Sequence, residues 1–67
     1  MDEIKANLLA LVEADADNAR TRAQRLRLLA KFIVGDEKQM LMQANVEEGS
    51  AKTYEGIAQR MRKEWGL

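Results

Sequence analysis

The side chains that most often carry chemistry in proteins are scarce in this sequence. Its 67 residues include no histidine and no cysteine, so the commonest general base, the thiol nucleophile and the usual zinc ligands are missing. The single serine, Ser50, follows a glycine and has the position of a helix cap. The glycines stand singly and form no phosphate-binding loop. We therefore expect a protein that is not an enzyme and has no catalytic residue, cofactor or metal.

Charged side chains are plentiful, and they are segregated along the chain. Eleven basic and eleven acidic side chains cancel, which gives no overall attraction to nucleic acid or to an anionic membrane. Acids dominate up to residue 18, whereas residues 20–31 hold five bases and no acid: Arg20, Arg22, Arg25, Arg27 and Lys31. This asymmetry indicates a directed electrostatic contact, such as one between copies of the chain. The simpler alternative is a solvated helix face whose bases find acids within the chain or across subunits.

The length of the chain sets a limit on its stability. A chain of this size buries only about 60% of the surface that its unfolded form exposes, and small domains usually add a disulfide, a metal or a partner. The chain has no cysteine to form a disulfide, and it lacks the usual zinc ligands. The sequence therefore predicts association with another chain. No apolar run reaches the roughly 18 residues of a membrane span, and the start MDEIKAN does not have the pattern of a signal peptide. We expect a cytoplasmic protein without membrane contact.

The predicted elements that position these residues are all helices, in one domain covering residues 1–67. Proline is absent and good helix formers are abundant. A first helix is expected over about 2–34, ended by Gly35, and Asp36 with Gln39 would form a capping box for a second helix over about 37–48. Gly49 would end that helix and Ser50 would cap a third over about 51–65. As an alternative, residues 32–43 could form a strand hairpin, because Phe32, Ile33 and Val34 favour strands.

A heptad pattern with a polar centre runs along the first predicted helix. Its positions are 4, 8, 11, 15, 18, 22, 25, 29 and 32, spaced alternately by four and three residues. The two ends are apolar, whereas the centre holds an acid, an amide and two arginines. This spacing predicts a seam for self-association, made of Leu8, Leu11, Asp15, Asn18, Arg22, Arg25, Leu29 and Phe32.

An antiparallel homodimer would make every layer of this seam complementary. Parallel pairing would stack like charges, because each residue would meet its own copy. In an antiparallel register that places Leu11 opposite Leu29, Asp15 meets Arg25 and Asn18 meets Arg22. The polar centre would then specify the orientation of the two chains.

The stretch ADADN, residues 14–18, could instead be a turn. Aspartate and asparagine are weak helix formers and good caps. Asp17 would then cap a separate helix, and the two halves would fold back so that Leu8 lies near Leu26. Since neither glycine nor proline marks a turn there, we favour the continuous helix.

Large adaptable side chains point to binding of a second, unidentified protein. Methionines are frequent at binding surfaces, and tryptophan and tyrosine often dominate interface energies. The candidate partner-binding residues are Met40, Met42, Tyr54, Met61 and Trp65; their alternative role is core packing. The favoured function is a small regulator, inhibitor or adaptor that self-associates and binds another protein.

Residues 40–64 also suggest an alternative function. The segment MLMQANVEEGSAKTYEGIAQRMRKE has a small residue in its first half, a glycine turn EEGS, and apolar positions beyond it. It resembles a helix-turn-helix unit, in which the second helix reads DNA. The glycine lies one place later than that pattern prefers. The residues that would face DNA are Lys52, Thr53, Gln59, Arg60, Arg62 and Lys63.

Overall fold

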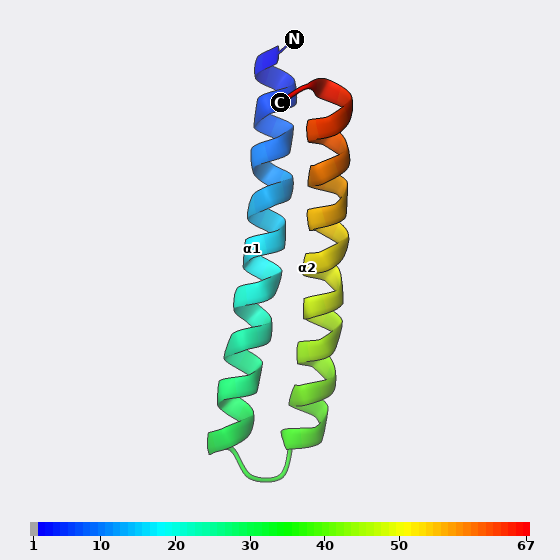
Figure 1. The fold of residues 1–67 in the computed structure, drawn as a ribbon. Coiled ribbons are helices and arrows are strands. Elements are labelled where there is room, and N and C mark those ends of the chain that lie inside the picture. Colours follow the sequence, from blue (N-terminus) through cyan, green and yellow to red (C-terminus); the bar gives the residue numbers. More distant parts are fainter. Residues whose placement is uncertain (1) are drawn as a thin grey trace.

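The chain forms a hairpin of two long helices. A computed structural model describes residues 2–67 and contains α1, Asp2–Phe32, and α2, Glu37–Trp65, joined by a short loop. The two helices run antiparallel, so that the first and last described residues lie at the same end and the loop lies at the other (Figure 1). The predicted all-helical class is confirmed for the described residues, but the predicted count of three helices is wrong.

α1 is continuous through the stretch that could have been a turn. Residues 14–18 are helical, as are the residues on both sides of them. Asp2 and Glu3 lie in the first turn and Lys31 in the last, where their charges complement the helix dipole. The prediction of one long N-terminal helix is therefore confirmed, although it ends at Phe32 rather than Val34.

The loop between the helices depends on one glycine. Gly35 has a φ of +115°, a conformation that side-chain-bearing residues rarely adopt. Asp36 holds the N-cap position of α2, but its side chain makes no capping hydrogen bond. Instead, the Gly35 N–H donates to Glu37 Oε2 at 3.1 Å. The expected capping box is thus absent, and the strand alternative over 32–43 is wrong because this region holds helix ends and the loop.

α2 passes straight through the predicted break at Gly49 and Ser50. Glycine and serine weaken a helix by roughly 1 kcal/mol or less each, so a helix that is packed along its length tolerates them. The Thr53 hydroxyl donates to the Gly49 carbonyl at 3.1 Å, a bond made within the continuing helix. α2 ends at Trp65 and is capped by Gly66, whose φ of +68° is left-handed and whose N–H donates to the Arg62 carbonyl. A glycine therefore caps the C-terminus of α2 at residue 66, whereas Gly49, where the sequence predicted a helix end, lies inside the helix.

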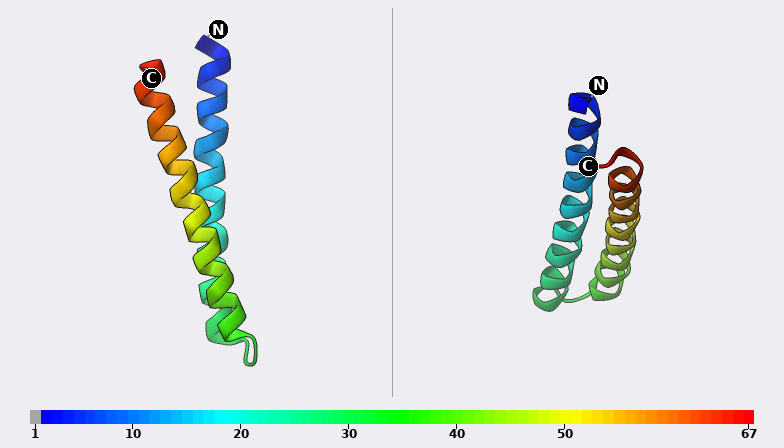
Figure 2. Two further views of the ribbon diagram at one scale, coloured as in Figure 1. Left: turned by 90° about the vertical axis from the view of Figure 1, so that its right-hand side faces the viewer. Right: turned by 45° about the horizontal axis from the view of Figure 1, so that its top comes forward.

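A seam of small side chains joins the two helices. It repeats every seven residues and alternates spacings of three and four, and its most buried members are alanines. Ala19, Ala44 and Ala51 are fully buried. Figure 2 shows the helices crossing at a small angle and staying together over their length. The seam consists of Leu9, Val12, Ala16, Ala19, Ala23, Leu26 and Ala30 on α1, and Met40, Ala44, Glu47, Ala51, Tyr54, Ala58, Met61 and Trp65 on α2.

This seam is not the one that the sequence predicted. Each α1 seam residue lies one position after a residue of the predicted pattern, so the predicted residues lie beside the seam and remain exposed. The reason is that alanines allow a close approach of the two helices along most of the seam, whereas Leu8, Leu11, Leu29 and Phe32 lie one position away and stay exposed. Within residues 2–67, no large side chain is consequently fully buried.

Candidate interaction surfaces

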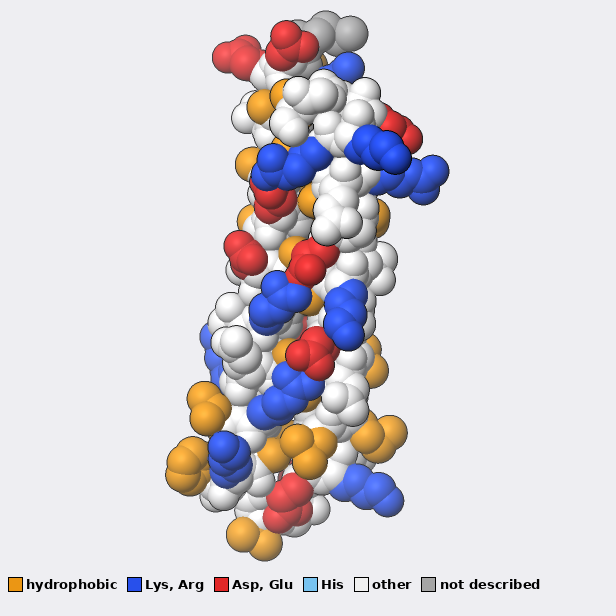
Figure 3. All heavy atoms as spheres, viewed as in Figure 1, with side chains coloured by type: hydrophobic (Ala, Val, Ile, Leu, Met, Phe, Trp, Pro, Cys, Tyr) orange, Lys and Arg blue, Asp and Glu red, His pale blue; other side chains and the backbone are white. Residues whose placement is uncertain are grey.

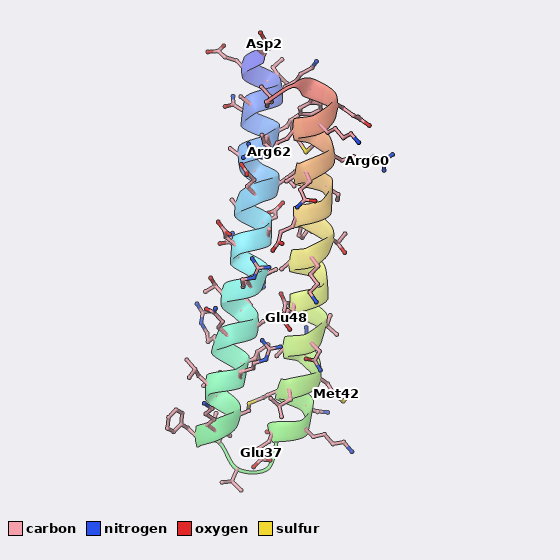
Figure 4. All side chains as sticks on the ribbon, viewed as in Figure 1. Asp2, Glu37, Met42, Glu48, Arg60 and Arg62 are labelled. Atoms are coloured by element: carbon pink, nitrogen blue, oxygen red, sulfur yellow. The ribbon has the colours of Figure 1, made fainter. Side chains whose placement is uncertain are left out.

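One side of the hairpin is held by ion pairs between the helices. Arg20 pairs with Glu55, Arg27 with Glu48, and Arg62 with Glu13. The pairs recur every seven residues on both helices, so they form a row, which we call the front face. Figure 3 views this face and shows acids and bases alternating along the groove between the helices. Figure 4 shows Glu48 and Arg62 lying between the two ribbons.

The Arg27–Glu48 pair is the best-defined interaction of the front face. The two guanidinium nitrogens of Arg27 donate to the two carboxylate oxygens of Glu48 at 3.2 and 2.6 Å, a bidentate arrangement. These hydrogen bonds, and the Arg27 charge, lower the pKa of Glu48 below its ordinary value. The same hydrogen bonds raise the pKa of Arg27. Arg27 also donates to Asn45.

The basic segment of α1 therefore finds its partners mainly within the chain. Arg22 makes a further pair with Glu47, at 2.7 Å, on the opposite side of the seam from the front face. Three of the five bases in residues 20–31 are thus paired with acids of α2 in the same molecule. These three arginines therefore follow the simpler alternative: they pair with acids of their own chain and not with acids of a second copy.

The predicted self-association residues form a continuous exposed surface, the outer face of α1. At 100° per residue, this face lies roughly 110° around α1 from the seam and opposite the front face. Leu11 is 62% exposed and Phe32 81% exposed. Asp15 and Arg25 make no ion pair or side-chain hydrogen bond to any residue within 2–67. The outer face comprises Ile4, Leu8, Leu11, Asp15, Asn18, Arg22, Arg25, Leu29 and Phe32.

The predicted partner-binding residues lie in two different environments, the seam and the exposed surface. Met40, Tyr54, Met61 and Trp65 are half-buried in the seam, which is the packing role. The Lys5 ammonium lies 5.6 Å from the centre of the Trp65 ring, so this tryptophan packs against α1 near the end of the hairpin opposite the loop. Met42 alone of the five is exposed, and Figure 4 shows it pointing away from α1.

A second group of exposed apolar side chains gathers where the helices meet the loop. Val34 is 94% exposed, and Figure 3 shows hydrophobic side chains concentrated at this end. Beside them is an open hollow of about 560 Å³ lined by Leu26, Met40, Met42 and Val46 among others. Sequence reasoning missed this surface apart from Met42, because the FIV run was interpreted as helix end or strand. We call its exposed residues the loop-end cluster: Leu28, Ile33, Val34, Leu41 and Met42.

The residues expected to face DNA lie along one uninterrupted helix. All six are exposed, but they spread around the outside of α2. Arg62 is paired with Glu13, and Arg60 lies 3.7 Å from Glu64. The helix-turn-helix geometry over 40–64 is therefore wrong, because the turn that would separate a reading helix from its support is helical.

Residues 2–67 hold no cluster of three or more potential acidic metal ligands. Neither described helix has a stretch that is both long and apolar enough to cross a bilayer. Comparison of the chain with models of protein families, with curated proteins and with solved structures finds no match in any of the three.

Proposed function

We propose that this protein is a non-catalytic adaptor or regulator that works by binding other proteins, including copies of itself. The observation that carries the proposal is the distribution of its apolar side chains. Alanines are most of the fully buried residues of the seam, whereas thirteen large hydrophobic residues within 2–67 are exposed. Groups of large exposed apolar side chains, such as those at the two ends of the outer face and around the loop, often mark protein-binding sites in soluble proteins.

The two exposed apolar surfaces suit two different tasks. The outer face of α1 is long, straight and has charges at its centre, which suits pairing with another long helix. The loop-end cluster lies around the loop, at one end of the hairpin, and contains the exposed Met42. Methionine adapts to varied apolar partners. We assign the binding of a second protein to the loop-end cluster.

A comparative capture experiment from the host lysate tests this assignment. Three immobilised baits are compared: the unaltered chain, the double variant Val34→Ser with Met42→Gln, and the control Leu67→Ser, which removes an exposed apolar side chain at the opposite end. We expect one or more proteins to bind the first and third baits stoichiometrically and to be lost from the second. Identical protein sets on all three baits, or nucleic acid released by salt as the only specific ligand, would contradict the proposal.

A further inference from the structure

The outer face of α1 is an exposed surface that runs along the whole helix, and its occupant can be argued from area, charge and geometry. The inference rests on the proposed function, because it names the partner for one of the two surfaces.

The first step is the accessible area of the hairpin. Its accessible surface is 5185 Å², whereas a compact protein of 7.6 kDa has roughly 4,300 Å². The excess, on the order of 900 Å², is close to the roughly 800 Å² that each partner buries in a standard interface. The radius of gyration shows the same departure: it is 15.2 Å, against roughly 11 Å for a compact chain of this length. The single hairpin thus leaves exposed about as much area as one stable interface covers.

The second step is the pattern of charges. Asp15 lies towards one end of the outer face and Arg25 towards the other, and neither has a partner within the described chain. In an antiparallel pair of α1 helices that sets Leu8 opposite Phe32 and Leu11 opposite Leu29, each Asp15 meets Arg25 of the other copy. A parallel pair would place each charge against its own copy. Only the antiparallel arrangement gives both ions an opposite charge.

The third step is the geometry of α2 on the same side. In this register the two copies are related by a two-fold axis that passes α1 at the level of Arg20. Because Arg20 forms an ion pair with Glu55, the same level on α2 lies near Glu55. On α2, the positions that correspond to the outer face lie one residue before each seam residue, and near this height they are Ser50 and Thr53. An open hollow of about 460 Å³ there is lined by Gly49, Ser50, Thr53 and Tyr54. The short side chains leave room for α2 of a second copy beside α2 of the first.

We propose that a second copy of this chain covers the outer face of α1 in this antiparallel register, so that two hairpins form a four-helix bundle. Leu8 and Leu11 of each copy pack against Phe32 and Leu29 of the other, and Asp15 pairs with Arg25 twice. The two loops then lie at opposite ends of the bundle. The dimer presents two loop-end clusters about one bundle length apart, so it can bridge two partner proteins.

The test uses two charge variants that should repel themselves and attract each other. Arg25→Asp makes both facing positions acidic, and Asp15→Arg makes both basic. Each variant alone should dimerise about tenfold or more weakly than the unaltered chain in sedimentation equilibrium. An equimolar mixture should recover most of the lost association, because the mixed dimer has opposite charges at both contacts. The matched controls Asp17→Arg and Lys31→Asp carry the same charge changes on exposed positions outside the outer face, and they should leave association unchanged.

A cross-linking measurement gives a second readout that does not depend on the charges. The chain has no cysteine, so Leu11→Cys and Leu29→Cys each introduce one thiol. A bis-maleimide spanning about 10 Å should link the two variants to each other when they are mixed. It should not link either variant to itself, because the two like positions would lie roughly 27 Å apart at 1.5 Å per residue.

The outcomes separate this inference from the proposed function. If the unaltered chain dimerises but the mixture recovers nothing and each cysteine variant links to itself, the register is wrong while self-association stands. If the unaltered chain stays monomeric up to 200 µM, both the register and the self-association part of the proposed function are wrong. Binding of a second protein at the loop-end cluster is judged separately, by the capture experiment.

Discussion

The front face and the outer face lie on opposite sides of α1 and differ in how their charges are used. On the front face, Arg20 and Arg27 meet acids of α2 in the same chain. On the outer face, Asp15 and Arg25 meet no opposite charge within residues 2–67, and large apolar side chains flank them. Both faces repeat with the same heptad spacing. The hairpin therefore pairs the charges on one side of α1 internally, whereas on the other side it leaves Asp15 and Arg25 without an opposite charge within residues 2–67.

The two faces also differ in what they contribute to stability. Exposed ion pairs stabilise a protein little, since solvent screens them and two long side chains must be ordered. Burial of leucine or phenylalanine contributes more, about 1.5–3 kcal/mol when it is complete. An alanine seam buries little apolar area for each residue. We therefore expect the outer face, once covered, to contribute more to the stability of the assembly than the whole row of front-face pairs.

The largest effect should come from the seam that both faces adjoin. Ala51 is fully buried between the helices, so Ala51→Leu forces them apart and should destabilise the fold by roughly 1–3 kcal/mol per chain. The melting temperature at fixed protein concentration should fall by roughly 4–8 °C for each kcal/mol. Ala14→Leu makes the same change at an exposed position of α1 and should change the melting temperature little. Equal effects of the two variants would show that the seam is not closely packed.

The next largest effect should fall on the outer face. Leu11→Gln replaces an apolar contact that occurs twice in the dimer, so the dissociation constant should rise by roughly ten- to a hundredfold. Leu28→Gln is the matched control, because Leu28 is similarly exposed but lies outside the outer face. Analytical ultracentrifugation of both variants gives the comparison. A loss of association with Leu28→Gln and none with Leu11→Gln would place the interface elsewhere.

A glycine change away from both faces should produce a smaller effect of the opposite sign. Gly56 is helical, exposed and has open space where a Cβ would lie. Gly56→Ala should therefore stabilise the fold by roughly 0.5–1 kcal/mol, measured by urea unfolding. Gly35→Ala should destabilise it, because the φ of Gly35 is +115°. A lower stability of Gly56→Ala would contradict this expectation. It would mean that the added methyl group meets another part of the assembly on the side of α2 opposite the seam.

The smallest effect should come from a single front-face pair, and it should depend on pH. The pKa of Glu48 is lowered in the folded protein by hydrogen bonds from Arg27, so the carboxylate stabilises the fold above the pKa that it has when unfolded. That contribution is lost as pH falls through the lowered folded value. Glu48→Gln should hence be slightly less stable than the unaltered chain at pH 7 and equally stable at pH 2. A difference that grew on acidification would contradict the assignment of this pair.

The sequence predicted the helices better than their contacts. Helix formers and the missing proline were enough to place α1, and Gly35 and Asp36 located the loop. Gly49 and Ser50 were misleading because the packing of α2 against α1, which is a long-range effect, outweighs the local cost of these residues. The helix preferences of Gly49 and Ser50 predict a break in α2, and they contain no information about the packing that keeps α2 continuous.

The position of the seam was missed for a different reason. Leucine and phenylalanine carry most of the hydrophobic signal in a sequence, and here they lie one residue away from the alanines that join the helices. The only available indication was alanine itself, recurring at 16, 23 and 30 and again at 44, 51 and 58. The front-face pairs could not be predicted either, because they require the register of α2 against α1. The pattern that was predicted describes the outer face instead, and whether a second copy covers it is the open prediction.

Sedimentation equilibrium of the unaltered protein tests the central claim most directly. The account predicts a helical species of twice the 7.6 kDa chain mass at tens of micromolar, stable over a several-fold range of concentration. A species of single-chain mass with undiminished helical circular dichroism would contradict the account, because the hairpin would then be stable with its outer face uncovered.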